Sequence, residues 1–422
     1  MIENIRKKLQ HFREIEGEFP NKNLLITLES QPLLALLKAQ KTIFPALYWQ
    51  DKELLQTIVC FGAIDDSETI PQVKGDIRYY GGLAFQQQGE QWPDFPAIRF
   101  IRPALEFIEQ DNKLTLTCHF DSHFSVTQSL TLIDQLQPPV ALQNMNAELL
   151  SRHDLPTKKQ WAELVDLAIE YKALLPKVVL SRQTELVCRE SINHCDLLYQ
   201  WQIANPASFH FSFQFSADYI FIGCSPERLF SRHNNQLHTE ALAGTVNRGR
   251  NAREDAILLQ SLLTDKKIDR ENYLVQEFII ANLKRLKADV VCDQPRVMQL
   301  HNVQHLCVPI HAQLTPQTTD ADLLYKLHPT PAVGGSPKLP ALQFINDNEP
   351  YLRGWYAGAV GYISEQKSDF SVAIRSALIS NNKIKLFAGA GIVTGSIAEQ
   401  EWLELDNKIH TVLEIISQTE DN

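Results

Sequence analysis

Apolar residues recur at the spacing of an amphipathic helix in several segments of the chain. One stripe ends at Pro176 and consists of Trp161, Leu164, Ala168, Tyr171 and Leu175. Another stripe, near the C-terminus, consists of Trp402, Leu405, Ile409, Val412 and Ile416. The patterns predict helices over residues 251–263, 267–287 and 398–417, and a further helix that carries the first stripe.

Other segments alternate apolar and polar residues, as half-buried strands do. Residues 208–215 (SFHFSFQF) form one predicted strand, and residues 219–224 (YIFIGC) return after a short turn. Residues 370–379 and 383–392 flank Ser380-Asn381-Asn382, which is a second hairpin signal. Because hairpins join antiparallel strands, long helices beside them predict an α+β fold rather than a doubly wound sheet.

Composition narrows the class of protein. The 422 residues are 44% hydrophobic, which is enough for a globular core, and the net charge of −10 argues against a nucleic-acid partner. The N-terminal segment lacks the apolar core of a signal peptide, and no apolar run reaches the length of a membrane span. The seven cysteines form no CxxC pair, so we expect reduced thiols and a cytoplasmic protein.

A glycine-rich stretch precedes the C-terminal helix. Gly389, Gly391 and Gly395 have the spacing GxGxxxG, which matches neither the dinucleotide fingerprint nor a phosphate-binding loop. The stretch therefore gives no support to a nucleotide-dependent phosphotransferase. Two interpretations stay open: a strand-to-helix turn that requires glycine, or a backbone that lets an anion approach amides at a helix N-terminus.

Carboxylates stand out on two predicted helices. Glu401, Glu404 and Lys408 share one face of the last helix, where solvated charge is the usual explanation. Glu271 lies at helical spacing from an apolar stripe and so faces inward. An inward carboxylate needs a cation, a metal or a set of hydrogen bonds, and glutamates from two helices would suit Mg²⁺. Spacing alone does not show whether the two helices meet.

Two further side chains lie at the ends of predicted strands. Lys177 begins the apolar strand KVVLSR, where a lysine most often extends its ammonium to solvent. In a desolvated site the same lysine would be a candidate general base. Glu227 follows the Ser-Pro turn of GCSPERL, which is typical of a turn or a helix start. At the mouth of a sheet it would be a candidate general acid.

These stretches belong to an ordered series of motifs: KVVLSR, GCSPERL, TEALAGT, DRENYLV, HPTPAVGG, WYAGAVGY, SVAIRSA, FAGAGIV and EWLELDNK. The series covers residues 158–416 and resembles the chorismate-utilising enzymes. That family includes isochorismate synthases, salicylate synthases and the large components of anthranilate and aminodeoxychorismate synthases. Residues 1–157 match less closely, but LYWQ (47–50) and GGLAF (81–85) resemble isochorismate synthases of the menaquinone pathway.

The resemblance implies a fold. We expect a single α+β domain over residues 1–422, with two packed antiparallel β-sheets and helices on the outside. Residues 158–416 would form its chorismate-binding catalytic region. Residues 135–160 are polar and carry three prolines, which by themselves fit a linker or a surface loop. The family fold makes this stretch a loop rather than a domain border.

The resemblance also implies roles for individual residues. Glu271 and Glu404 would bind Mg²⁺ directly, and Glu401 would bind it through a water molecule. The substrate-binding positions that it implies are Gly244, Thr245, Tyr356, Arg375, Gly389 and Lys408. Chorismate is a dianion, so an arginine, backbone amides and a metal are suitable partners for it.

The position of Lys177 indicates the branch of the family, because isochorismate and salicylate synthases carry lysine there and ammonia-using branches do not. Lys177 would activate the water that adds at C2 of the ring, and Glu227 would protonate the C4 hydroxyl as it leaves. The expected activity is the reversible, Mg²⁺-dependent conversion of chorismate to isochorismate, the first committed step of menaquinone biosynthesis. No glutaminase motif occurs in the chain, and no glutaminase subunit is expected. Salicylate synthase and a non-catalytic chorismate-binding protein remain alternatives.

Two positions depart from the family pattern. Relatives often carry an acidic residue where Ile268 stands and a histidine where Asn272 stands, and the first change would thin the outer shell of the metal. The sequence leaves open the oligomeric state, the choice between menaquinone and siderophore pathways, and any residual pyruvate-lyase activity.

Overall fold

The computed structural model describes residues 1–145, 147–299 and 303–417, without the side chains of Thr245, Asn247, Lys266, Lys267 and Val303. Its helices are α1 (Ile2–Glu16), α2 (Leu33–Ala39), α3 (Val126–Gln135), α4 (Lys158–Glu170), α5 (His194–Ala204), α6 (Ala252–Thr264), α7 (Lys266–Arg285), α8 (Asp320–Leu327), α9 (Lys338–Asn348) and α10 (Ala398–Ser417). Within the described ranges, none of these helices is both long and apolar enough to span a membrane.

The strands are β1 (Leu24–Leu28), β2 (Ala46–Gln50), β3 (Gln56–Ser67), β4 (Arg78–Leu83), β5 (Ile98–Gln110), β6 (Lys113–Cys118), β7 (Leu149–Leu155), β8 (Lys177–Cys188), β9 (Phe209–Gln214), β10 (Ile220–Ser225), β11 (Arg228–His233), β12 (Gln236–Asn247), β13 (Asp289–Cys292), β14 (Arg296–Gln299), β15 (Val303–Gln313), β16 (Gly335–Ser336), β17 (Ala359–Ser364), β18 (Lys367–Val372), β19 (Ser376–Ser380) and β20 (Lys383–Val393).

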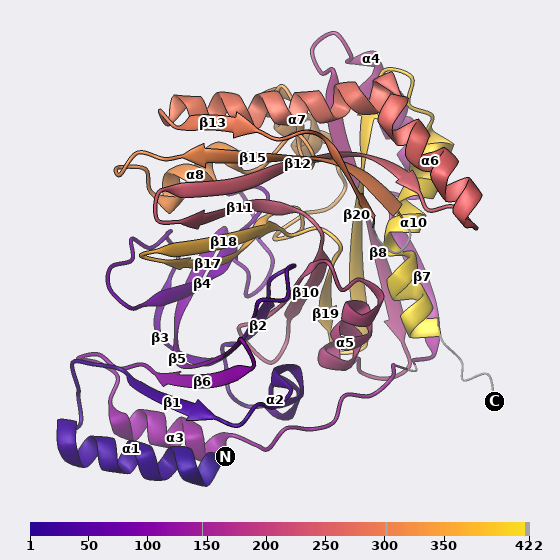
Figure 1. The fold of residues 1–422 in the computed structure, drawn as a ribbon. Helices are drawn as coiled ribbons and strands as arrows, with labels where there is room; N and C mark the ends of the chain where they lie inside the picture. Colours follow the sequence, from indigo (N-terminus) through magenta and orange to yellow (C-terminus); the bar gives the residue numbers. More distant parts are fainter. Residues whose placement is uncertain (146, 300–302, 418–422) are drawn as a thin grey trace.

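The strands form two antiparallel sheets that share β5 (Figure 1). The first sheet runs β7–β8–β20–β19–β10–β9–β2–β3–β5–β6–β1, and the second runs β15–β12–β11–β18–β17–β4–β5. The short strands β13 and β14 pair with β15, and β16 pairs with β8. The predicted α+β fold with two antiparallel sheets is confirmed, and the structure adds that the sheets are continuous through β5.

Aromatic side chains fill the space between the two sheets. Trp49 of β2 and Phe211 of β9, both from the first sheet, stack with ring centroids 6.5 Å apart. Trp49 also meets Tyr362 of β17, from the second sheet, edge-on at 6.4 Å. All three side chains are buried. Such pairs contribute beyond the apolar area that they bury, so this core fixes the two sheets against each other.

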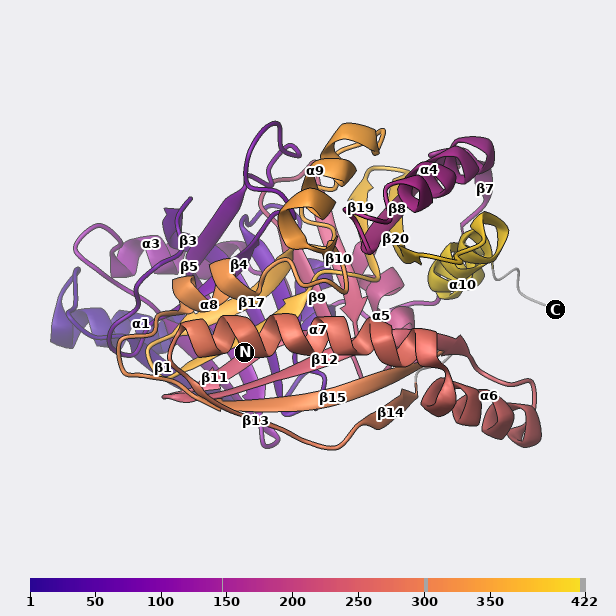
Figure 2. The ribbon, with the colours of Figure 1, turned by 90° about the horizontal axis from the view of Figure 1, so that it is seen from above.

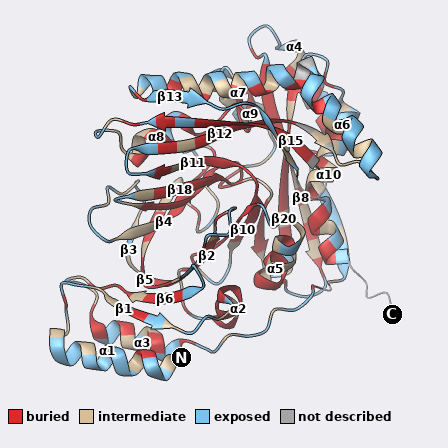
Figure 3. Cartoon of the chain, viewed as in Figure 1, coloured by how far each residue is buried: buried red, intermediate tan, exposed pale blue. Residues whose placement is uncertain are grey.

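Helices cover the outside of the sheets, as predicted (Figure 2). α7 packs on β12 and β15 of the second sheet, and α10 packs on β20 of the first sheet and on α4. α1, α2 and α3 cover the N-terminal strands through a second apolar cluster that includes Ile5, Leu36 and Ile133. The strands are largely buried, whereas α1 and the outer face of α7 are exposed (Figure 3).

The predicted helices are confirmed as α6, α7 and α10. The first apolar stripe is confirmed in part, because Trp161, Leu164 and Ala168 lie on α4, which ends at Glu170 before Tyr171 and Leu175. Two predictions about the strands were wrong. Segment 370–379 is not one strand but divides into β18 and β19, and Arg375 in the break has a φ of 47°. Residues 149–155, predicted as part of a loop, form β7 at the edge of the first sheet. Because β7 is mostly exposed, its sequence lacks the alternation that predicts a strand.

Two of the points where the chain crosses between the sheets are neighbours. Pro226 and Glu227 join β10 of the first sheet to β11 of the second, and the break at Arg375 joins β18 to β19. The crossings are adjacent because β10 pairs with β19 and β11 pairs with β18. The N–H of Val372 donates to Glu227 O at 3.0 Å, and the N–H of Cys224 donates to Arg375 O at 2.9 Å. The backbone thus holds two predicted site residues close together.

Candidate functional site

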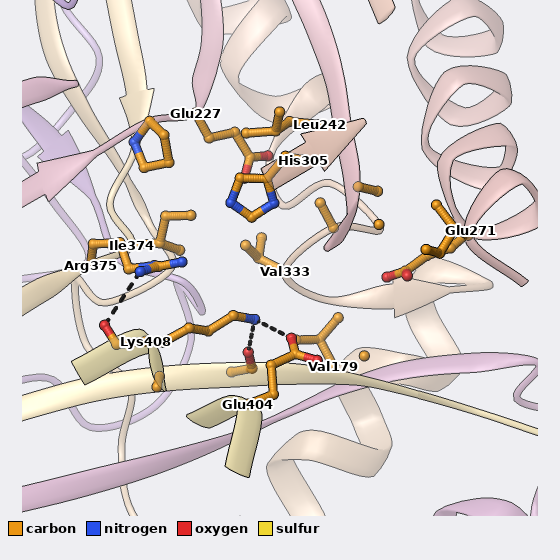
Figure 4. A pocket seen from close by; sticks show the side chains of 18 of the residues that line it. Val179, Glu227, Leu242, Glu271, His305, Val333, Ile374, Arg375, Glu404 and Lys408 are labelled. Carbon is orange, nitrogen blue, oxygen red and sulfur yellow. Dashed lines mark hydrogen bonds and ion pairs between the residues drawn. The ribbon is translucent and has the colours of Figure 1, made fainter. Parts of the chain in front are cut away.

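A cavity of about 310 Å³ lies where the crossings meet β20, α7 and α10. Its volume is at the lower end of the range for small-molecule sites. Its lining includes most of the predicted site residues, namely Glu227, Gly244, Glu271, Tyr356, Arg375, Gly389, Glu401, Glu404 and Lys408. Several of them are seen in Figure 4, where Glu271 points in from α7 on the side opposite Arg375. The structure therefore brings together residues that lie far apart in the sequence.

Lys177 lies just behind the cavity wall. Its side chain is fully buried at the start of β8, and its Nζ forms an ion pair with Glu271 Oε1 at 2.8 Å. Gly391 of β20 lines the cavity beside this pair. A Cβ at residue 391 would lie 2.9 Å from Glu271 Oε1 and 3.3 Å from Lys177 Cε. The missing side chain at Gly391 therefore leaves the lysine and the glutamate room to reach the cavity.

Glu227 has the properties of a general acid. Its carboxyl group is buried in the crossing between β10 and β11. Burial, as the main cause, and the charge of Glu240 raise the pKa of Glu227 to about 8. Three nearby lysines oppose this shift, namely Lys177, Lys52 and Lys408. At neutral pH the group is therefore mostly protonated, as an acid that donates a proton must be.

Two cationic side chains line the same cavity. Lys408 Nζ donates to Gly389 O at 2.7 Å and to Glu404 Oε1 at 2.6 Å. Arg375 Nη1 donates to Lys408 O at 3.4 Å. No carboxylate among the described residues lies within ion-pair distance of Arg375. Burial lowers the pKa of its guanidinium. A guanidinium in this setting favours a ligand carboxylate as its partner.

Two side chains approach the backbone of Gly389 so closely that a larger residue would not fit there without displacing them. A Cβ there would lie 2.9 Å from Tyr356 Oη and 3.2 Å from Val179 Cγ1. Tyr356 stacks on Phe387 with ring centroids 5.0 Å apart. Burial raises the pKa of Tyr356, so its hydroxyl group stays protonated and can donate to a ligand. Gly389 and Gly391 lie within β20, whereas Gly395, with a φ of 90°, lies in the turn between β20 and α10. The strand-to-helix interpretation therefore fits Gly395, and the approach of an anion to backbone amides stays a prediction.

Gly244 occupies a bulge in β12. Its φ is 85°, and the ladder with β15 shifts register between Leu242 and Thr245. A Cβ at residue 244 would collide with Cγ2 of Ile268. The side chain of Thr245 lies outside the described part of the structure, so its contact with substrate stays a prediction.

The three glutamates predicted as metal ligands line the cavity but do not form a closed ligand set. Glu271 pairs with Lys177, and Glu404 pairs with Lys408. Within the described ranges, no group of three or more histidine, cysteine, aspartate or glutamate residues is gathered closely enough to hold a metal ion. The assignment of Glu271, Glu401 and Glu404 as ligands therefore remains a prediction.

The charges of the cavity nevertheless fit a hard divalent cation. Its carboxyl groups belong to Glu227, Asp265, Glu271, Glu401 and Glu404, whereas its cationic side chains are Arg375 and Lys408. Even with Glu227 protonated, the lining is net negative. An anionic ligand would be repelled by this cavity unless a cation entered with it, and oxygen donors are the ligands that Mg²⁺ prefers.

Sequence reasoning missed His305, which also lines the cavity. Burial, followed by the charges of Arg375 and Lys408, lowers the pKa of His305 to about 3, so the imidazole is neutral. His305 lies on β15 in the segment NVQHLCVPI, opposite Thr245 in the ladder. β15 also carries the polar residues Gln304 and His311, so polarity does not distinguish His305, and the sequence does not show which face of that strand opens on the cavity.

The two departures from the family pattern lie beside each other in the structure. Ile268 belongs to a small apolar cluster with Leu262 and Leu306, and it also lines the cavity. Asn272 is buried, and its Nδ2 lies 3.0 to 3.1 Å from three backbone oxygens, those of Ala241, Ala243 and Leu306. The amide of Asn272 thus ties α7 to β12 and β15.

We expect Asn272→Ala to lower the free energy of unfolding by about 1–3 kcal/mol, because it leaves buried carbonyl groups without their donor. Urea unfolding followed by circular dichroism measures this. Asn282→Ala is the matched control, since Asn282 is also buried on α7 but its Nδ2 donates only within the helix, to Phe278 O at 2.9 Å. Equal losses in the two variants would contradict the anchoring role.

The chain is similar to known proteins along most of its length. The family described as "Chorismate binding enzyme" matches residues 39–417. The chain is 36% identical over 391 residues to isochorismate synthase MenF of Escherichia coli (strain K12), covering 89% of this chain and 88% of that protein. It is 32% identical over 402 residues to isochorismate synthase MenF of Haemophilus influenzae, covering 93% and 91% respectively.

Comparison with solved structures agrees with the comparison of sequences. The solved structure of MenF, the menaquinone-specific isochorismate synthase from Escherichia coli, matches with a TM-score of 0.88 at 32% identity and covers 98% of this chain and 100% of that chain. This chain belongs to the family of chorismate-binding enzymes. The resemblance seen in its sequence is thereby confirmed.

Proposed function

We propose that this protein is an isochorismate synthase, an isomerase that interconverts chorismate and isochorismate with Mg²⁺. The observation that carries the proposal is a protonated acid and a buried lysine at one cavity. Glu227 comes from the crossing between the sheets and Lys177 from the start of β8. Membership of the chorismate-binding family and the relatives named isochorismate synthase support the same activity.

The carboxylates of chorismate bind to the cationic side of the cavity. Arg375 pairs with the enolpyruvyl carboxylate, and Lys408 adds positive charge beside it. Backbone amides near Gly389 and Gly244 donate to a substrate carboxylate, because neither residue has a side chain that would keep the ligand away. Tyr356 donates its hydroxyl group from the wall next to Gly389.

Mg²⁺ would complete the charge balance of the complex. Glu271 and Glu404 would hold it directly, and Glu401 would hold it through a water molecule. When bound, the ion supplies the positive charge that holds the ring carboxylate in a cavity otherwise rich in acidic groups. In support of this role, Glu271 lines the cavity, where its carboxylate lies 2.8 Å from the side-chain nitrogen of Lys177.

The reaction exchanges one hydroxyl group for another. Lys177, as the neutral amine, takes a proton from a water molecule whose oxygen bonds to C2 of the ring. The double bonds shift, the bond from C4 to its hydroxyl oxygen breaks, and Glu227 gives that oxygen a proton, so that water leaves. One water enters and one leaves, so substrate and product are isomers. The reverse reaction uses the same groups in opposite roles, with protonated Lys177 as the acid and ionised Glu227 as the base.

Product analysis tests the proposed activity. We expect purified protein to convert chorismate to isochorismate with Mg²⁺, to approach the same equilibrium mixture from either compound, and to stop when a chelator removes the metal. Chromatography of the products measures this. Salicylate with equimolar pyruvate as the main product would move the protein to the salicylate branch. Tight binding of chorismate without any turnover would instead indicate a non-catalytic binding protein.

The pathway is part of the proposal. Menaquinone biosynthesis is favoured because both bacterial relatives and the solved structure carry the name MenF, and the structure is described as menaquinone-specific. We further propose that the enzyme acts without a glutaminase subunit, since water rather than ammonia is the nucleophile. The cytoplasmic location is also a proposal, supported by seven cysteines that are all free thiols in the structure.

A further inference from the structure

The connection that carries Glu227 lies outside both ladders. Pro226 and Glu227 come between the last residue of β10 and the first residue of β11. The N–H of Glu227 donates to Ser225 Oγ at 3.3 Å, and its carbonyl oxygen accepts from Val372. These contacts hold Glu227 itself. The residues on either side of it need other partners if the carboxyl group is to keep a fixed direction.

A buried ion pair supplies those partners. Lys52 Nζ donates to Glu240 Oε1 at 2.5 Å and to Pro226 O at 3.3 Å. The same oxygen of Glu240 accepts the backbone N–H of Arg228 at 2.9 Å. The residue before Glu227 and the residue after it are therefore both attached to one pair. The side chain of Lys52 is only 9% exposed and that of Glu240 is fully buried, so water competes little for these contacts.

The pair also sets the charge next to the acid. Glu240 raises the pKa of Glu227, and Lys52 lowers it. Lys177 from β8 and Lys408 from α10 also lower the pKa of Glu227. Arg375 from the second crossing, His305 from β15 and the carboxyl groups of α7 and α10 line the same cavity, and Arg228 follows Glu227 in the chain. Neither Lys52 nor Glu240 is among the residues that line the cavity. Their influence therefore passes through Glu227 rather than through contact with substrate.

We infer that Lys52 and Glu240 are positioning residues for the general acid, which hold the backbone on both sides of Glu227 and balance the charge beside its carboxyl group. The inference rests on the proposed role of Glu227. Lys52 belongs to the turn between β2 and β3, two residues after the stretch LYWQ. Asp51 closes that turn by accepting two backbone N–H groups at 2.9 Å. Glu53, the residue after Lys52, accepts a bidentate pair from Arg228 at 2.7 and 2.8 Å, which ties the turn to the crossing a second time.

The test uses Lys52→Met and Glu240→Gln, which remove one charge each at nearly constant size. Infrared difference spectroscopy follows the protonated carboxyl band of Glu227, identified by its loss in Glu227→Gln. We expect Lys52→Met to raise the midpoint of this titration and Glu240→Gln to lower it, each by about one pH unit. Turnover of chorismate should fall by about 10- to 100-fold in both variants, because the acid loses its fixed direction. Lys52→Arg, which keeps the charge, should restore much of the activity.

Controls separate positioning from loss of structure. Lys38→Met removes an equally buried lysine, paired with Asp196 at 2.8 Å, and should leave the titration of Glu227 unchanged. If a single variant unfolds, the double variant, which has no unpaired charge, should fold and titrate near the wild-type midpoint. Unchanged titration of Glu227 in all folded variants would overturn the inference. Opposite shifts in a protein that forms no isochorismate would instead support the charge link and overturn the proposed function.

Discussion

Replacing Glu227 by glutamine should reduce the turnover of chorismate by about 10²- to 10⁴-fold, the usual contribution of a general acid. Glutamine keeps the size of the side chain but cannot transfer a proton to the leaving hydroxyl group. Binding of chorismate should change little, because in the proposed complex Glu227 takes no part in holding the carboxylates. Steady-state rates and titration calorimetry with chorismate measure the two effects. Turnover close to that of the wild type would exclude Glu227 as the acid.

The pKa of Glu227 adds a check on stability. In the folded protein the value is about 8, against an ordinary value of 4.5, so folding favours the protonated form. Its contribution to stability is complete below about pH 4.5 and is lost as the pH rises through about 8. Glutamine does not ionise, so the melting temperature of Glu227→Gln relative to wild type should increase over this range. A difference that does not vary with pH would contradict the raised pKa. In the wild type, forward turnover should decline as Glu227 loses its proton at alkaline pH.

Replacing Lys177 should have an effect of similar size. Lys177→Met fills the buried site at the start of β8 but cannot take a proton from water, so we expect turnover to fall by about 10²- to 10⁴-fold. It also leaves Glu271 without the partner at 2.8 Å, which would by itself alter the cavity. The rate of isochorismate formation at saturating chorismate and Mg²⁺ measures the loss.

A second substitution distinguishes the base from the ion pair. Lys177→Arg keeps a positive charge near Glu271, but a guanidinium group does not lose its proton in proteins. Both Lys177→Met and Lys177→Arg should therefore be inactive, while the control Lys38→Met stays active. Activity in Lys177→Arg would show that the charge at this position matters and that the proton transfer occurs elsewhere.

Much of the fold follows from local patterns in the sequence. α7 and α10 were predictable because their apolar stripes keep helical spacing over many residues, and β9 and β10 because a turn separates two alternating runs. β7 was not predictable, because its pairing with β8 is made by the backbone while its side chains remain mostly exposed. The break at Arg375 was not predictable either. The chain changes there from the second sheet to the first, and the local pattern of apolar and polar residues does not indicate such a change.

The site was predictable to a different degree. The resemblance named Glu227, Arg375 and Lys408 as site residues, because ordered motifs carry residue positions with them. The structure brings the three residues to one cavity, and their roles stay predictions. The ion pair of Lys177 with Glu271 could not be foreseen, because it joins residues on β8 and α7 that only tertiary packing brings together. The position of His305 at the cavity could not be foreseen for the same reason.

The pairing of β2 with β9 and of β4 with β17 has a consequence for chimeric enzymes. In each pair a strand from the N-terminal third closes an edge that the rest of the chain would leave open. Exposed edges of this kind invite association with other chains. A chimera that joins parts of this enzyme and of a relative near residue 157 would therefore have to preserve the registers of both strand pairs. It would also have to take Lys52, Glu53 and Arg228 from the same parent protein.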